Sequence, residues 1–261
     1  MSIITLTTDF GNGSPYAAAM KGVILSINPA TVVVDITHGV PAQDIREGSI
    51  ILAETTPWFP QGTIHVAVID PGVGTGRAIV YARIAGQQYV LPDNGLLSRL
   101  VDKHKPEQLI RVENREYWLA EVSSTFHGRD IMAPVAARLS LGLDPEKLGP
   151  PVEKLTELSW PDVRQTAARI EGQVLRADSF GNLITNIPGK MLAGRPTDTR
   201  VCVVCNIYET WGIYSTYSEQ PYGALIALVG SSGHVELALV GDNAAKRLGI
   251  PIGAPVVLSW E

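Results

Sequence analysis

Charge and cysteine are both scarce in this sequence, and neither basic nor apolar residues form long runs. Charged residues make up 18% of the 261 residues, and the formal net charge is −5. The lack of any Lys/Arg run argues against nucleic acid or an anionic membrane as a partner. Because no apolar run approaches the ~20 residues that span a bilayer, we expect no transmembrane helix. Small neutral or cationic ligands suit this composition better.

Secretion signals and metal-binding spacings are missing as well. Residues 1–8 have no basic segment and no cleavage site, so we expect a cytoplasmic protein. The only cysteines are Cys202 and Cys205, which stand in an apolar run typical of a buried strand. A zinc site needs two more ligands at a recognisable spacing, and the sequence has none. The pair therefore favours core thiols over metal or redox chemistry.

Residues 1–160 alternate between strand and helix patterns. We expect strands at 3–8, at 31–36 and up to Ile69, and helices at 16–27 and 44–56. This alternation gives two successive βαβ units and hence a mainly parallel, helix-covered sheet. Later patterns predict a hairpin at 79–84 and 88–91, a helix at 96–101, a strand at 118–122 and a helix at 131–141.

The pattern lapses in a proline-bearing stretch at 149–164, where we place a boundary between domains 1–160 and 161–261. The second domain has the short strands of a small sandwich or barrel. Its strands are expected at 170–175, 183–187, 201–207, 225–229, 235–240 and 256–260, with one helix at 243–248.

A glycine-rich loop after the strand ending at Ile69 carries Asp70 and Arg77. Ligands bind at the C-terminal edge of open α/β sheets, and glycines let the backbone approach them closely. The loop is not a phosphate-binding loop, because Gly-x-x-x-x-Gly-Lys-Ser/Thr is absent. Asp-Pro-Gly also suits an ordinary turn, so a site and a plain turn both stay open.

Other polar clusters follow predicted strands. Asp9 and His127 come directly after two of them, and if these strands are parallel, both side chains share one sheet edge with Asp70. In the second domain, residues 178–182 and 230–236 combine glycine with hydrogen-bonding side chains. These two clusters are either ordinary turns or parts of a ligand pocket.

Seven motifs stand in order along essentially the whole chain. They are Thr8-Asp9-Phe10-Gly11, Met20-Lys21-Gly22, Asp70-Pro71-Gly72-Val73-Gly74, Pro92-Asp93-Asn94-Gly95, Thr125-Phe126-His127-Gly128-Arg129-Asp130, Phe180-Gly181-Asn182 with Thr185-Asn186, and Asn243-Ala244-Ala245. Together they resemble the S-adenosyl-L-methionine (SAM) hydrolases that form adenosine, relatives of the SAM-dependent fluorinase and chlorinase. The resemblance implies an α/β N-terminal domain, a smaller C-terminal β-barrel-like domain and a homotrimer. It places the ligand between the N-terminal domain of one subunit and the C-terminal domain of its neighbour.

The same resemblance implies an activity and its residues. Water or hydroxide attacks the ribose C5′ of SAM, including its R-sulfonium epimer, and gives adenosine and L-methionine without a metal or redox cofactor. Asp70, Arg77 and His127 match the hydrolytic triad, and Asp9 matches the acid that binds the ribose hydroxyls. The remaining matches are Phe180, Asn182 and the backbone near Val240 toward adenine, Asp178, Ser231, Ser232 and Glu236 toward methionine, and Tyr217 beside them.

Four positions bear on specificity and on the alternatives. Asp70, Gly128 and Gln43 stand where the halogenases carry an aromatic residue, a halide-binding serine and a tryptophan, which favours water over halide. Ser14 stands where many hydrolases have an acid, so anchoring of the methionine ammonium falls more on the second domain. A non-catalytic SAM- or adenosine-binding module and a metal-dependent hydrolase using Asp9, Asp70 and His127 remain alternatives, which turnover and chelator sensitivity distinguish.

Overall fold

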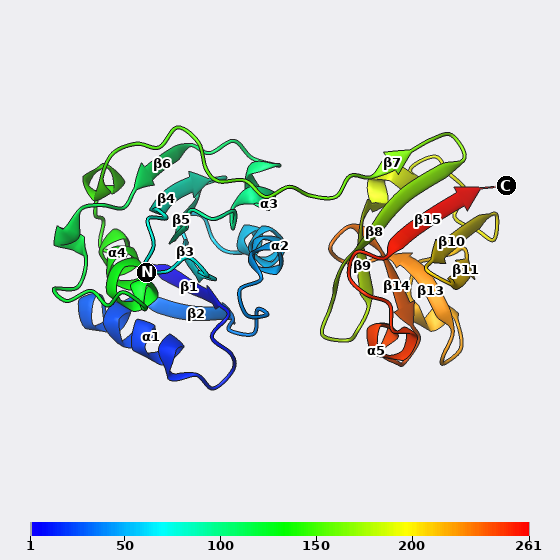
Figure 1. Ribbon diagram of the computed structural model, residues 1–261, viewed down its shortest axis with the longest axis horizontal. Helices are drawn as coiled ribbons and strands as arrows, with labels where there is room; N and C mark the ends of the chain where they lie inside the picture. Colours follow the sequence, from blue (N-terminus) through cyan, green and yellow to red (C-terminus); the bar gives the residue numbers. More distant parts are fainter. Residues whose placement is uncertain (1, 261) are drawn as a thin grey trace. The chain divides into compact units, whose positions relative to one another are not determined.

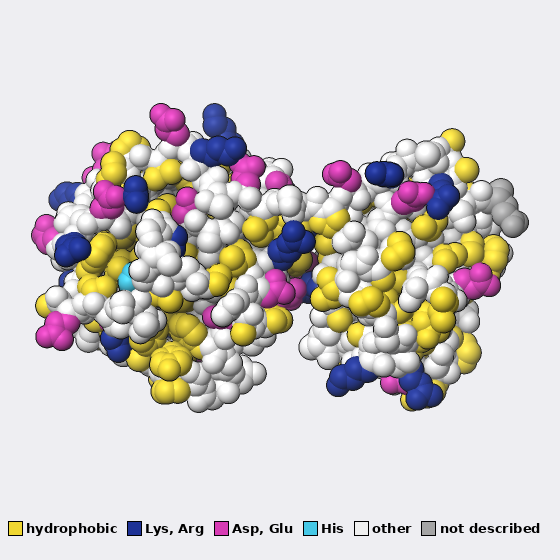
Figure 2. All heavy atoms as spheres, viewed as in Figure 1, with side chains coloured by type: hydrophobic (Ala, Val, Ile, Leu, Met, Phe, Trp, Pro, Cys, Tyr) yellow, Lys and Arg dark blue, Asp and Glu magenta, His cyan; other side chains and the backbone are white. Residues whose placement is uncertain are grey.

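The computed structural model describes residues 2–260. The chain forms two compact units, Met1–Leu158 and Ser159–Glu261, each with its own hydrophobic core (Figure 1). No helix within residues 2–260 is long and apolar enough to cross a membrane. On the face drawn in Figure 2, acidic and basic side chains are interspersed over both units.

The N-terminal unit is built on a six-stranded sheet of order β2-β1-β3-β5-β4-β6. Its strands are β1 (Ile3–Thr8), β2 (Val32–Thr37), β3 (Ile64–Val68), β4 (Ile79–Ile84), β5 (Gln87–Pro92) and β6 (Gln108–Arg111). The first four in spatial order run parallel, while β4 and β6 are antiparallel to their neighbours. The mainly parallel sheet predicted from the βαβ alternation is confirmed.

Helices cover both faces of this sheet, with α1 and α4 on one side and α2 and α3 on the other (Figure 1). The helices are α1 (Pro15–Ile27), α2 (Ile45–Thr55), α3 (Ser98–Val101) and α4 (Ala133–Ser140). Short helical turns are η1 (Thr56–Trp58), η2 (Arg115–Tyr117), the π-helical η3 (Gly128–Met132) and η4 (Pro145–Leu148). Because strand side chains alternate, Val66 and Val68 enter the α1/α4 core while Ala67 and Ile69 enter the α2/α3 core.

Local sequence signals explain where the long helices begin. The Ser14 side chain accepts a hydrogen bond from the Tyr16 N–H, and Pro15 occupies the first turn, where its missing N–H costs nothing. The Asp44 side chain caps α2 in the same way by accepting from the Glu47 N–H.

The strand predicted at 118–122 is wrong. This segment follows η2 and forms no ladder, and its Leu119 N–H donates instead to the Asp130 carbonyl. The edge position beside β4 is taken by β6, a short strand with polar ends that the apolar pattern did not reveal. The helix predicted at 131–141 also begins earlier, through η3.

The C-terminal unit is a nearly closed barrel of order β11-β10-β15-β8-β9-β14-β13-β12, with β7 beside β8. The strands are β7 (Arg164–Gln165), β8 (Arg169–Ala177), β9 (Leu183–Pro188), β10 (Val201–Cys205), β11 (Tyr208–Trp211), β12 (Ile213–Tyr214), β13 (Leu225–Val229), β14 (His234–Leu239) and β15 (Pro255–Trp260). Short helices are η5 (Gly189–Leu192), η6 (Tyr217–Glu219) and α5 (Ala244–Leu248). The Thr210 hydroxyl donates to the Leu225 carbonyl at 2.7 Å and so links β11 to β13. This confirms the barrel-like second domain.

The two cysteines lie on opposite faces of β10. Cys205 belongs to the barrel core, where burial raises the pKa of its thiol to about 11, while Cys202 is half-buried. A thiol that stays protonated is a poor metal ligand and a poor nucleophile, which supports a packing role for Cys205.

Candidate active site

The loop that follows β3 turns twice and returns toward the sheet. The Val73 N–H donates to the Asp70 carbonyl and the Thr75 N–H to the Gly72 carbonyl, each at 3.1 Å. Gly74 has φ +77°, and a Cβ there would lie 2.5 Å from the Ser124 carbonyl oxygen. Only glycine fits this contact, which holds the loop against residues 123–127.

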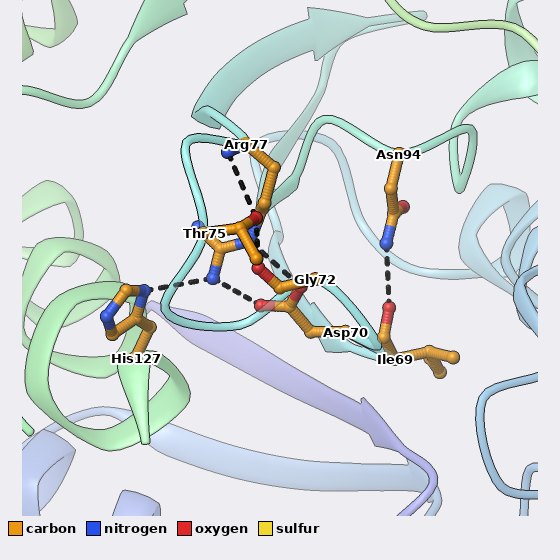
Figure 3. A network of polar contacts seen from close by, with 7 residues as sticks. All are labelled: Ile69, Asp70, Gly72, Thr75, Arg77, Asn94 and His127. Atoms are coloured by element: carbon orange, nitrogen blue, oxygen red, sulfur yellow. Dashed lines mark hydrogen bonds and ion pairs between the residues drawn. The ribbon is translucent and has the colours of Figure 1, made fainter. Parts of the chain in front are cut away.

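Asp70, Arg77 and His127 meet at this loop (Figure 3). Arg77 Nε donates to Asp70 Oδ1 at 2.8 Å, and Arg77 Nη2 forms an ion pair with Asp70 Oδ2. The same Nη2 lies 2.9 Å from His127 Nδ1. The two paired side chains are nearly buried, at 11% exposure for Arg77 and 5% for Asp70. The arrangement is a bidentate, charge-assisted pair with the imidazole at its end.

The position of Arg77 fixes the protonation of His127. A guanidinium donates hydrogen bonds and never accepts them, so His127 Nδ1 must accept and the proton of a neutral ring sits on Nε2. Burial and the Arg77 charge lower the pKa of His127 below the usual 6.5, against the opposite effect of Asp70 and Asp130. The imidazole therefore stays neutral at neutral pH and presents an N–H donor.

Neighbouring motifs hold this loop and the sheet edge in place. The Asn94 amide donates to the Ile69 carbonyl at 2.9 Å, next to Asp70 (Figure 3). The buried Asp130 carboxylate accepts from the Ser123 N–H at 2.8 Å and so shapes the segment that carries His127. Both Asn94 and Asp130 belong to the sequence motifs, and in the structure their side chains hold backbone segments in place.

Asp9 and Asp70 follow β1 and β3, which are adjacent and parallel, so both carboxylates stand at the same sheet edge as predicted. His127 does not follow a strand, since it precedes η3, and that part of the prediction is wrong. Asp9 is half-buried, and its Oδ2 accepts from the Gln43 N–H at 2.8 Å. Gln43 takes the left-handed backbone conformation, with φ 65°.

A second polar cluster lies in the C-terminal unit. Asn182 Nδ2 donates to Asp178 Oδ2 at 3.0 Å and to the Tyr217 hydroxyl at 3.5 Å, and that hydroxyl in turn donates to Glu236. Glu236 is buried, which raises the pKa of its carboxyl; Tyr217 opposes this shift and Asp178 adds to it. Burial and the bond to Glu236 raise the pKa of Tyr217 as well. Four of the predicted binding residues thus form one network.

The other predicted binding residues surround this cluster less tightly. Phe180 is 78% exposed at the tip of the β8–β9 turn. Ser231 and Ser232 belong to the β13–β14 turn, and Ser232 Oγ is buried without a hydrogen-bond partner among residues 2–260. The Val240 N–H donates to the Ala224 carbonyl and its own carbonyl accepts from the Gly223 N–H, so both backbone groups are already occupied.

A cavity of about 610 Å³ adjoins Arg77 and His127 in the N-terminal unit. Its further lining includes Arg111, Arg115 and Trp118. Across the part of the chain that the structure describes, no three His, Cys, Asp or Glu side chains form a group that could hold a metal ion.

Two family models match this chain. The SAM hydroxide adenosyltransferase N-terminal domain matches residues 4–149, and the C-terminal domain of that family matches residues 172–257. The chain belongs to the SAM hydroxide adenosyltransferase family. The motif resemblance is thereby confirmed.

Individual proteins are also similar to this chain over nearly their full length. A protein of Salinispora tropica named (R)-S-adenosyl-L-methionine hydrolase is 38% identical, covering 96% of this chain and 95% of its own. One of the same name from Thermus thermophilus is 38% identical, covering 99% and 100%. A fluorinase of Nocardia brasiliensis is 27% identical, covering 97% and 95%. The crystal structure of an uncharacterized conserved protein from Thermotoga maritima matches with TM-score 0.92 and 32% identity, covering 98% and 99%.

Two of the positions at which the resemblance predicts a difference from the halogenases have structural consequences. Asp70 is tied to Arg77 by two contacts, so an aromatic residue there would leave the guanidinium without its carboxylate. A Cβ at Gly128 would lie 3.1 Å from Val68 and 3.3 Å from Met20 Sδ, so a serine there requires these side chains to shift.

Proposed function

We propose that this protein hydrolyses SAM, with preference for the R-sulfonium epimer, at the ribose C5′ to give adenosine and L-methionine. The observation that carries the proposal is the contact of Asp70, Arg77 and a neutral His127 at the sheet edge. The full-length similarity to proteins named (R)-S-adenosyl-L-methionine hydrolase supports the substrate and its epimer.

Chemistry at the triad follows from its protonation. The oxygen of a water molecule forms a bond to C5′ while the C5′–S bond breaks. The electron pair of the C5′–S bond goes to sulfur and neutralises the sulfonium, so no acid is needed. His127 Nε2–H donates to the attacking oxygen and orients it. Asp70 accepts the proton that the water loses, since His127 Nδ1 is occupied by Arg77. Arg77 holds the Asp70 carboxylate in place through two contacts until then.

Binding of the substrate falls to side chains in both units. The Gln43 N–H occupies Asp9 Oδ2, and within residues 2–260 Oδ1 has no hydrogen-bond partner, which leaves it to the ribose hydroxyls. Both N–H groups of Asn182 are used, so its amide oxygen is left to accept from a donor such as the adenine amino group. The exposed Phe180 ring suits packing on the base.

The ammonium and the carboxylate at the methionine end of the substrate each need a partner. Asp178 and Glu236 supply negative charge, and Ser231 and Ser232 supply hydroxyl donors in the adjoining turn. Tyr217 lies beside this set through its contact with Glu236, while the backbone near Val240 packs against adenine. We further propose that the protein is cytoplasmic and uses no metal or cofactor. We also propose a homotrimer with the site at the subunit interface, which the polar clusters in both units support.

The test uses purified protein with separated R- and S-SAM, with and without chelator, followed by chromatography of adenosine and methionine. We expect equal release of the two products from R-SAM, insensitive to chelator and lost in Asp70→Asn. The exposed Asp102→Asn is the matched control.

Other outcomes identify the alternatives. Saturable binding of SAM without turnover indicates a binding module, and a halogenated nucleoside formed only with added halide indicates a halogenase. Activity abolished by chelator indicates a metal-dependent hydrolase. Each of these results would overturn the proposal.

A further inference from the structure

A line of polar contacts runs from helix α1 to the residue beside Asp9. Lys21 Nζ lies 2.5 Å from Asp35 Oδ2, and Asp35 Oδ1 lies 3.1 Å from His38 Nε2. The other ring nitrogen, His38 Nδ1, lies 2.9 Å from the hydroxyl of Thr8. Thr8 is fully buried and directly precedes Asp9 in the chain.

An irregularity in β2 makes this line possible. Leu6 of β1 pairs with Asp35, but the next residue, Thr7, pairs with Thr37, so Ile36 is an extra residue in β2. In a regular strand, residues three apart point to opposite faces. The extra residue reverses this for Asp35 and His38 and brings their side chains together.

His38 also joins the two loops that position Asp9. Its carbonyl accepts from the Gly11 N–H at 2.8 Å, and the Thr8 hydroxyl that faces its ring accepts from the Phe10 N–H at 3.3 Å. The loop after His38 then returns to Asp9, where the Gln43 N–H donates to the carboxylate. With its side chain only 13% exposed, His38 acts through its neighbours rather than on a ligand.

We propose that His38 is a positioning residue that sets the Asp9 carboxylate for the ribose hydroxyls of the substrate. This inference rests on the proposed function, because that function gives Asp9 its ligand. The ring holds the β1 and β2 loops at a fixed separation. Gln43 can then occupy one Asp9 oxygen while the other stays open to the sugar.

The experiment measures dissociation constants of adenosine and 2′,3′-dideoxyadenosine by calorimetry, which needs no turnover. In wild type, adenosine binds more tightly because it carries the hydroxyls. In His38→Ala, we expect this preference to shrink about tenfold, the loss of roughly one well-placed hydrogen bond to a charged group. His38→Asn, whose amide can replace Nδ1 toward Thr8, restores most of it, and the exposed His104→Ala leaves it unchanged.

Kinetics give a second readout. KM for SAM rises in His38→Ala while kcat changes little, because the triad lies on other loops. If thermal unfolding shows that His38→Ala does not fold, Asp35→Ala removes the acceptor that faces His38 Nε2 and decides the question.

Two results would overturn the inference. If both nucleosides bind His38→Ala more weakly by the same factor, the pocket has loosened in general. If both dissociation constants are unchanged, the ring does not act on the ribose. Nucleoside preference in wild type without release of adenosine from SAM leaves this inference standing and refutes the proposed function alone.

Discussion

At the scale of single residues, backbone contact sets the geometry of the triad. Gly74 touches the Ser124 carbonyl, and this contact fixes the loop that carries Arg77 relative to the segment that carries His127. Gly76, two residues on in the same loop, has open space around the position of a Cβ. The two glycines therefore form a matched pair for testing whether this contact matters.

We predict that Gly74→Ala separates the two segments and lowers kcat, while Gly76→Ala does so far less. The left-handed backbone and the clash in Gly74→Ala should also cost about 1–3 kcal/mol of unfolding free energy. Steady-state kinetics and urea unfolding of both variants check this. Equal kcat values in the two variants would contradict it.

Individual site residues were predictable to different extents. Strand-end position and glycine content singled out Asp70 and Arg77, but the contact between Arg77 and His127 spans 50 residues and has no signature in the spacing. It entered through the family resemblance. The partners of His38 could not be predicted from the sequence, because they depend on one extra residue in β2.

At the scale of elements, β3 carries a histidine where its neighbours are apolar. The buried His65 ring lies 2.7 Å from the Thr5 hydroxyl and stacks on Tyr89 with centroids 5.1 Å apart. Burial lowers the pKa of His65 to about 4 from 6.5. Folded β3 thus excludes a proton that the unfolded chain accepts.

Stability should therefore decline as pH falls from 6.5 toward 4, because only the unfolded state then gains the proton of His65. The loss is on the order of 3 kcal/mol. Urea unfolding at pH 7 and pH 4.5 measures it. His65→Asn, less stable at pH 7, should lose this part of the pH dependence, and a slope equal to that of wild type would refute the assignment.

Element prediction succeeded where the local signal and the tertiary environment agree. The β-branched run of β1 is a local signal, and the helix predicted at 16–27 begins next to a local cap, Ser14. Residues 118–122 are apolar without being a strand, because the edge of the sheet is already occupied by β6. Which segment pairs at an edge depends on the whole sheet, and an apolar run alone does not determine it.

At the scale of the whole molecule, the proposed substrate needs the triad of the first unit and the Asp178–Glu236 cluster of the second. In the proposed homotrimer, these come from different subunits. Inactive Asp70→Asn and inactive Glu236→Gln chains then complement each other when mixed.

Co-refolding the two variants in equal amounts should restore about one quarter of wild-type activity, because each site draws its two halves at random from the two kinds of subunit. Adenosine release by the mixture, against each variant alone, measures this. A mixture as inactive as its components would show that both halves come from one chain.

The burial of β3 on both of its faces also limits the motion of the N-terminal unit. All five of its residues are buried, and it lies between β1 and β5 with helices against both faces. Its amide protons should exchange with solvent only when the whole N-terminal unit opens, among the slowest in the chain. Asp70 is thus anchored to a slowly exchanging strand, and substrate entry is left to the loops around it.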